Sequence, residues 1–131
     1  MLSNSFHHFR PEDARRILAD AVRARRGIAV MEWVERRLAS ILFTVIASIV
    51  SIFVTPFIRP FRLSRLVLCW LVPLIPITVL VDGIVSCLRA YSVPELEELV
   101  AQVPGSAAYE WRAERLPYGA LATTLLVGMP R

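Results

Sequence analysis

The chain has 131 residues, which is enough for one compact domain but short for a complete enzyme of a two-layered α/β class. It carries 15 basic residues, all of them arginine, against 11 acidic residues, so its positive charge is modest. The arginines are scattered among carboxylates and are not interleaved with stacking aromatics. This pattern argues against nucleic acid as a partner.

The sequence shows neither the cysteine pattern of a metal site nor a secretory signal. Cys69 and Cys87 are isolated in apolar surroundings, without the paired spacing of a zinc site, and we expect buried thiols in a reducing compartment and no metal centre. The segment from Met1 to Arg10 is polar and aromatic and does not resemble a secretory signal. We therefore expect a cytoplasmic location, or a membrane that faces the cytoplasm.

The N-terminal quarter predicts a helix followed by a strand. From Pro11 to Arg26, apolar residues recur at helical spacing and arginines occupy the other face, which is typical of an amphipathic helix. Pro11 suits its first turn, and Gly27 is expected to close it. The short apolar run from Gly27 to Val34 predicts a strand buried on both faces of a parallel sheet.

The longest apolar segment of the chain, Leu38 to Ile58, contains no charged residue. As a helix it would be about 31 Å long, which matches the hydrocarbon core of a bilayer. Its hydroxyl residues share one helical face, where small side chains let another backbone approach closely, namely Ser40, Thr44, Ser48, Ser51 and Thr55. A second stretch, Leu66 to Val81, contains Pro73 and Pro76 and is too short and interrupted for a regular span.

Arginines flank the long apolar segment on both sides. Arg36 and Arg37 precede it, and the segment from Arg59 to Arg65 follows it. Basic residues normally mark the cytoplasmic end of a span, so a simple orientation satisfies neither end. Two alternatives stay open: a transmembrane helix, or a helix that lies in the membrane interface or covers the protein as an apolar lid. We expect the segment from Leu38 to Ile58 to associate with a membrane or a detergent-like apolar surface.

The C-terminal third predicts a capped helix and a β-hairpin. Ser92 and Glu95 have the spacing of a capping box, and the following apolar face comprises Leu96, Leu99, Val100 and Val103. Pro104 and Gly105 should end this helix. Two strands are expected at 108–115 and 120–128, joined through residues 116–119 and paired as an antiparallel hairpin.

This order of elements resembles the last part of the class I S-adenosylmethionine-dependent methyltransferase fold, whose seven-stranded sheet ends in a reversed hairpin strand. Local sequences carry the same resemblance. The segment from Ser3 to Phe9 followed by Pro11 to Leu18 looks like the family's "HHF, then acidic, then helix" segment after the fourth strand. The segment from Asp82 to Ser92, the triplet Tyr109 to Trp111 and the ending Gly128 to Pro130 are similar to a subset of these enzymes.

The resemblance implies a partial Rossmann-like methyltransferase fold of the α/β class, with a long apolar helical insertion. Residues 1–37 would give a helix and a parallel strand, residues 38–81 the insertion, and residues 82–131 the last helix and the antiparallel strand pair. The Gly-rich turn that holds S-adenosylmethionine is absent from this sequence, so a missing N-terminal half would supply it. We expect the chain alone to be inactive.

Two functions remain open on this basis. In its complete form, the methyltransferase-like fragment would transfer a methyl group from S-adenosylmethionine to an apolar small molecule. The alternative is a small, non-enzymatic membrane protein with one or two transmembrane helices.

The resemblance also implies site residues. His7 and His8 follow the fourth strand of the family, beside cofactor and substrate, and imidazole can act as a base near neutral pH. Ser5 and Phe6 would line the cofactor there. Glu32, at the end of its strand, would face the same crevice and contact the substrate. Arg89 and Tyr91 would hold a substrate head group, and so would Asp82.

Several of these residues also have a structural interpretation. The two histidines would then shape the turn that enters a helix, and Glu32 would pair with Arg36 one helical turn later. Asp82 and Gly83 would form a turn, and Arg89 would pair with a carboxylate. These structural interpretations are the ones that the sequence favours.

Overall fold

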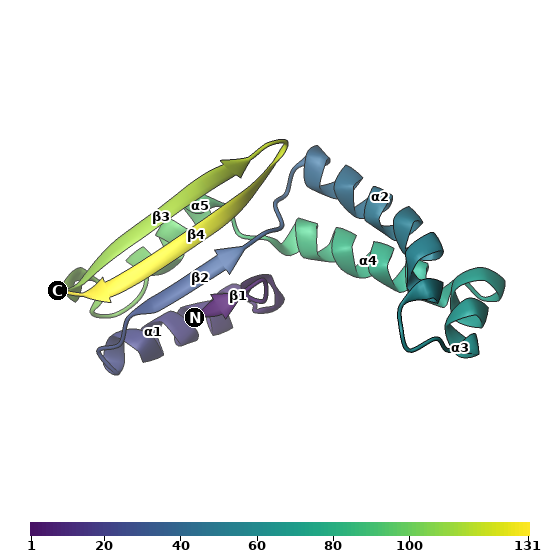
Figure 1. Ribbon diagram of the computed structural model, residues 1–131. Coiled ribbons are helices and arrows are strands. Elements are labelled where there is room, and N and C mark those ends of the chain that lie inside the picture. Colours follow the sequence, from purple (N-terminus) through teal and green to yellow (C-terminus); the bar gives the residue numbers. More distant parts are fainter. The chain divides into compact units, whose positions relative to one another are not determined.

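The computed structural model describes residues 1–131 as a mixed α/β chain with two compact units. One unit, here called the sheet unit, comprises Met1–Arg36 and Leu88–Arg131. The other, here called the apolar unit, comprises Arg37–Cys87. Figure 1 shows the elements of both.

The sheet unit contains a four-stranded mixed sheet in the order β1-β2-β4-β3. Its strands are β1 (Leu2–Ser3), β2 (Ile28–Glu32), β3 (Tyr109–Tyr118) and β4 (Leu121–Pro130). β1 pairs with β2 in parallel, whereas β4 is antiparallel to both β2 and β3, so β4 alone is reversed. The strand at 27–34 was expected to lie in a parallel sheet. This is correct for its neighbour β1 but wrong for its other neighbour, β4. The hairpin strand β4 pairs with the edge of β2 opposite β1.

Helix α1 (Pro11–Arg23) links β1 to β2, and together they form a complete βαβ unit. The predicted helix is confirmed, but its end differs from the expectation. Arg25, with φ 49°, takes the left-handed position, and the Arg26 N–H donates to the carbonyl of Ala21 at 3.0 Å. This arrangement is a Schellman motif, so Gly27 does not close the helix.

Helix α5 (Val93–Ala101) begins with the predicted capping box, which the structure confirms. The Ser92 N–H donates to the Glu95 carboxylate at 2.8 Å. Helices α1 and α5 contribute to one core with residues of β2 and β4, so both helices pack on the same face of the sheet (Figure 1). The buried residues of this core are Phe6, Ala14, Leu18, Val30, Leu96, Leu99, Val100, Val103 and Leu126.

The predicted antiparallel hairpin is also confirmed, with a tighter turn than expected. Tyr118 pairs with Leu121, so Gly119 and Ala120 alone form the loop, and Gly119 has φ 60°. Residues 116–118, expected in the connection, belong to β3 instead. A two-residue loop with glycine in its first position matches the right-handed twist of the strands, which explains the longer pairing.

The apolar unit consists of helices joined by irregular turns. α2 (Leu38–Val54) continues into the 3-10 turn Thr55–Phe57, and α3 (Leu63–Leu66) continues into the π-helical turn Val67–Leu71. α4 (Leu74–Arg89) follows. The stretch Leu38–Phe57 is long and apolar enough to cross a membrane, with a mean hydropathy of 2.4 and only 11% of it buried. The segments Leu63–Leu71 and Leu74–Arg89 would form a second such stretch, but they are bent by 67°.

The turn expected at Asp82 and Gly83 is wrong, because both residues lie inside α4. Gly83 faces Thr44 of α2, and a Cβ atom at Gly83 would collide with the Thr44 methyl group. The Thr44 hydroxyl also lies 3.8 Å from the Cys87 thiol. The hydroxyl face of α2 therefore allows α4 to approach closely, as the spacing predicts. Both cysteines are buried, as expected.

A close contact between neighbouring strands gives a test of this sheet. A Cβ atom at Gly128 would overlap the rigid ring of Trp111, which lies opposite it in β3. We expect Gly128→Ala to lower the free energy of unfolding by about 1 to 3 kcal/mol, the usual effect of overpacking. Denaturant unfolding in mild detergent, followed by near-ultraviolet circular dichroism, measures this change.

Gly27→Ala is the matched control for this experiment. Its Cβ atom would meet the flexible end of the Met129 side chain at 2.7 Å, which can move away. Equal stability of Gly128→Ala and the wild-type chain would contradict the contact between Trp111 and Gly128.

Candidate functional site

The candidate site lies at the carboxyl ends of β1 and β2, in the sheet unit. The turn after β1 begins at Asn4, which has φ 47° and whose N–H donates to the carbonyl of Met31 at 2.7 Å. Asparagine tolerates this left-handed conformation better than most residues, so the chain can leave the sheet sharply here. Glu32 is the last residue of β2. Open α/β sheets bind ligands outside the carboxyl ends of their strands.

The Glu32 carboxylate holds the turn after β1 in place. It is 1% exposed, and its Oε1 accepts the backbone N–H groups of Ser5 at 3.0 Å and Phe6 at 2.5 Å. Its Oε2 lies 2.5 Å from Nδ1 of His7. Burying a carboxylate is costly unless its oxygens find donors, and here both oxygens do. The expected pair of Glu32 with Arg36 is wrong, because the chain leaves the sheet after β2 without continuing as a helix.

The two histidines differ in their surroundings. Both lie in the 3-10 turn Phe6–His8 that precedes α1, as the structural interpretation proposed. His7 is 2% exposed, whereas His8 is exposed, and their ring centroids are 4.2 Å apart. Because the carboxylate of Glu32 takes Nδ1 of His7, Nε2 is the ring nitrogen left to face a substrate.

Arg89 and Tyr91 donate hydrogen bonds to two backbone carbonyls of the same turn. The Arg89 guanidinium donates to the carbonyl of His8 at 3.2 Å, so its expected pairing with a carboxylate is wrong. The Tyr91 hydroxyl donates to the carbonyl of Phe9 at 2.8 Å, and its ring lies 5.5 Å from that of Phe6. Burial, with the nearby Glu95 carboxylate, raises the pKa of Tyr91. The hydroxyl therefore keeps its proton and remains a donor.

The structure thus places the expected site residues together, with one exception. The residues that meet at this turn are Ser5, Phe6, His7, His8, Glu32, Arg89 and Tyr91. Asp82 belongs to the apolar unit instead.

The surroundings of Ser5 and Phe6 do not fit S-adenosylmethionine. Their N–H groups are taken by Glu32, and the Phe6 ring is fully buried. Both Glu32 oxygens are also occupied, so no carboxylate at this turn is left for cofactor hydroxyls. Residues 1–131 also contain no group of three or more His, Cys, Asp or Glu side chains placed to hold a metal ion.

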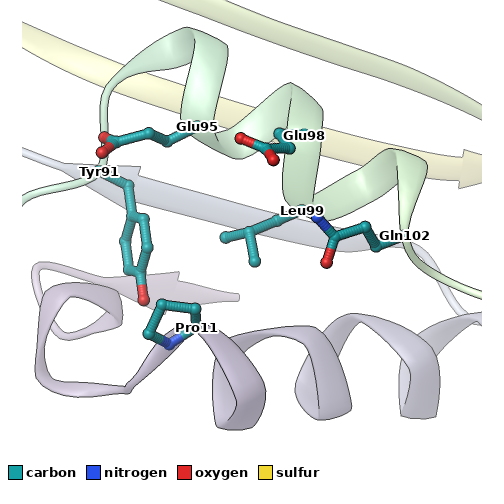
Figure 2. Close-up of a pocket in the computed structure, with 6 residues that line it drawn as sticks. All are labelled: Pro11, Tyr91, Glu95, Glu98, Leu99 and Gln102. Carbon is teal, nitrogen blue, oxygen red and sulfur yellow. The ribbon is translucent and has the colours of Figure 1, made fainter.

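A cleft of about 240 Å³ opens beside Tyr91, which no sequence pattern had predicted. Figure 2 shows Tyr91 and Pro11 at one end and side chains of α5 along it. The cleft is lined by Pro11, Tyr91, Glu95, Glu98, Leu99 and Gln102. Arg36 already pairs with the Glu95 carboxylate, so Glu98 supplies the carboxylate that a polar or cationic group could meet in this cleft. The capping-box spacing placed Glu95 on the first turn of α5, but not beside Tyr91.

Two ion pairs position the loop that follows β2. Glu35 is 8% exposed and binds the Arg115 guanidinium through both of its oxygens, at 2.6 and 3.1 Å. Arg36 pairs with Glu95 of α5. These contacts join residues far apart in the sequence, so spacing alone could not have predicted them.

No protein-family model matches this chain, and no curated protein or solved structure is significantly similar to it. The resemblance to methyltransferases therefore stays a prediction.

The pKa of Glu95 gives a test of its contacts with Arg36 in the loop after β2 and with Ser92, the N-cap of α5. Burial alone would raise this pKa, but hydrogen bonds from Arg36 and Ser92 outweigh it, so the pKa is lowered. A lowered folded-state pKa stabilises the fold above the unfolded-state pKa, and this stabilisation is lost as the pH falls through the folded-state value. We expect Glu95→Gln to be less stable than the wild type near neutral pH, with a difference that shrinks below about pH 4.

Unfolding of both proteins as a function of pH measures this difference. Glu97→Gln removes a charge from the exposed side of the same helix and should leave the contacts of Glu95 and their acid dependence in place. A difference between wild type and Glu95→Gln that stays constant down to acidic pH would contradict the assignment.

Proposed function

We propose that the sheet unit forms the acceptor side of a membrane-associated enzyme in which His7 is the general base. The reaction that the resemblance favours is methyl transfer from S-adenosylmethionine to an apolar small molecule. The observation that carries the proposal is the pair of Glu32 and His7 at the carboxyl ends of β1 and β2. Such a pair is a common way to orient a histidine for proton transfer.

The chemistry assigned to this chain is the removal of a proton. An acceptor O–H or N–H group that gains a methyl group must lose its proton, and Nε2 of His7 would receive it. The Glu32 carboxylate, 2.5 Å from Nδ1, would stabilise the imidazolium that forms. His7 is 2% exposed, so the acceptor atom would have to approach the edge of the ring.

The cofactor would have to be held by residues outside this sequence. The N–H groups of Ser5 and Phe6 and the oxygens of Glu32 are already bound to each other, and the chain contains no Gly-rich turn. The topology supports a shared fold: β1, β2 and β3 run in one direction, and β4 is reversed. The resembling family also has one reversed strand, in its terminal hairpin.

The apolar character of the proposed substrate rests on the apolar unit. The stretch Leu38–Phe57 leaves most of its surface unburied although it is strongly apolar. Such a surface favours a lipid environment, where an apolar substrate would also concentrate.

The same stretch favours a second candidate function, a small membrane protein without enzymatic activity. In that case the contacts around Glu32 would only stabilise the turn after β1. The two candidates differ in whether His7 matters for a reaction, and the following experiment separates them.

We expect His7→Ala to lower methyl transfer by about 100-fold or more when this chain is joined to a Gly-rich, cofactor-binding half. His8→Ala is the matched control, because His8 is exposed and lacks the Glu32 contact. Transfer of a radiolabelled methyl group to lipid extracts measures activity, and circular dichroism checks that each variant is folded. Full activity in both variants would rule out His7 as the base, and no activity in any joined protein would favour the second candidate.

A further inference from the structure

The connection between α2 and α4 is basic and lacks acidic partners. We call the segment Phe57–Leu71 the tip. It contains Arg59, Arg62 and Arg65 and no acidic residue, and the only acidic residue of the whole apolar unit is Asp82. No salt bridge involves the tip. Arg59 and Arg62 are exposed, so their charges are available to a partner.

The irregular backbone around the tip is satisfied by the chain itself. The Arg65 guanidinium donates to the carbonyls of Ile58 at 2.6 Å and Pro60 at 3.2 Å. The indole N–H of Trp70 donates to the carbonyl of Ile52, near the end of α2, at 2.9 Å. Irregular backbone is tolerated at a membrane only where its polar groups find such partners, because lipid offers none.

The tip also exposes aromatic side chains beside its arginines. Phe57, Phe61 and Trp70 are 74%, 61% and 59% exposed. Tryptophan is enriched at the level where hydrocarbon meets the polar head groups, and interfacial helices combine Trp or Phe with arginines there. In water alone, this combination would leave a large apolar area without a partner.

We propose that the tip binds the phosphate groups of an anionic phospholipid surface. Arg59 and Arg62 contact the phosphates, because the guanidinium fork matches phosphate oxygens. Phe57, Phe61 and Trp70 lie at the interface beneath them. Arg65 has a different role, because its guanidinium already binds the carbonyls of the tip. This inference deepens the proposed membrane association and names the lipid class.

The test uses the full chain and two kinds of vesicle. One contains only phosphatidylcholine, and the other contains equal parts of phosphatidylcholine and phosphatidylglycerol. Partition is measured by flotation after dilution from detergent. We expect the wild type to prefer the anionic vesicles, and Arg59→Gln/Arg62→Gln to lose about 30-fold in partition to them, since each basic residue near such a surface contributes about 1 kcal/mol.

Arg10→Gln/Arg26→Gln is the matched control, since it removes the same charge from the sheet unit. We expect this variant to keep the wild-type preference for anionic vesicles, and added salt to reduce that preference in both proteins. An equal loss in the two double variants would show that net charge alone is responsible and would overturn the assignment to the tip.

The outcomes for the two proposals are distinguishable. Equal binding of the wild type to both kinds of vesicle would overturn the head-group proposal and leave membrane association intact. Binding to neither kind would contradict membrane association, and with it both proposals. A preference for anionic vesicles that disappears only in Arg59→Gln/Arg62→Gln is the result that supports the tip as the lipid-binding segment.

Discussion

The sheet unit depends on the contacts that the buried Glu32 carboxylate makes with the turn after β1. β1 has only two residues, so its pairing with β2 is too short to fix the chain that follows. Glu32 supplies acceptors for two backbone N–H groups and for His7 in that following turn. This turn places the fully buried ring of Phe6 in the core, and α1 begins directly after it. Without this carboxylate, the buried Phe6 N–H group and the buried His7 ring would lose their partner, which is far more costly than losing a surface ion pair.

The same contacts limit what the turn can do chemically. Arg89 and Tyr91 bind its carbonyls at His8 and Phe9, and Glu32 accepts two of its N–H groups. Most of the expected site residues are therefore partners of one another rather than free ligands. What remains is the second nitrogen of His7 and the cleft beside Tyr91. This is why we assign a proton-transfer role to the turn and place the cofactor outside these residues.

The elements that could be predicted from the sequence are those with local causes. The helix from Pro11 and the cap at Ser92 follow from side-chain periodicity and from residues a few positions apart. Glu32 was assigned the wrong partner because its donors precede it by more than twenty residues, and no spacing rule spans that distance. Asp82 and Gly83 have the composition of a turn, but the close approach of α2 and α4 requires glycine inside the helix. The candidate site was thus predictable as a set of residues, but its hydrogen bonds were not.

The central claim, that Glu32 orients His7, can be tested by nitrogen NMR of the imidazole in the detergent-solubilised chain, with His8→Gln used to assign the two histidines. We expect Nδ1 of His7 to carry a proton in the wild type, because it faces a carboxylate at 2.5 Å. In Glu32→Gln, which lacks the negative charge, the proton should shift toward Nε2, as in free histidine. An unprotonated Nδ1 in the wild type, or the same tautomer in both proteins, would contradict the account.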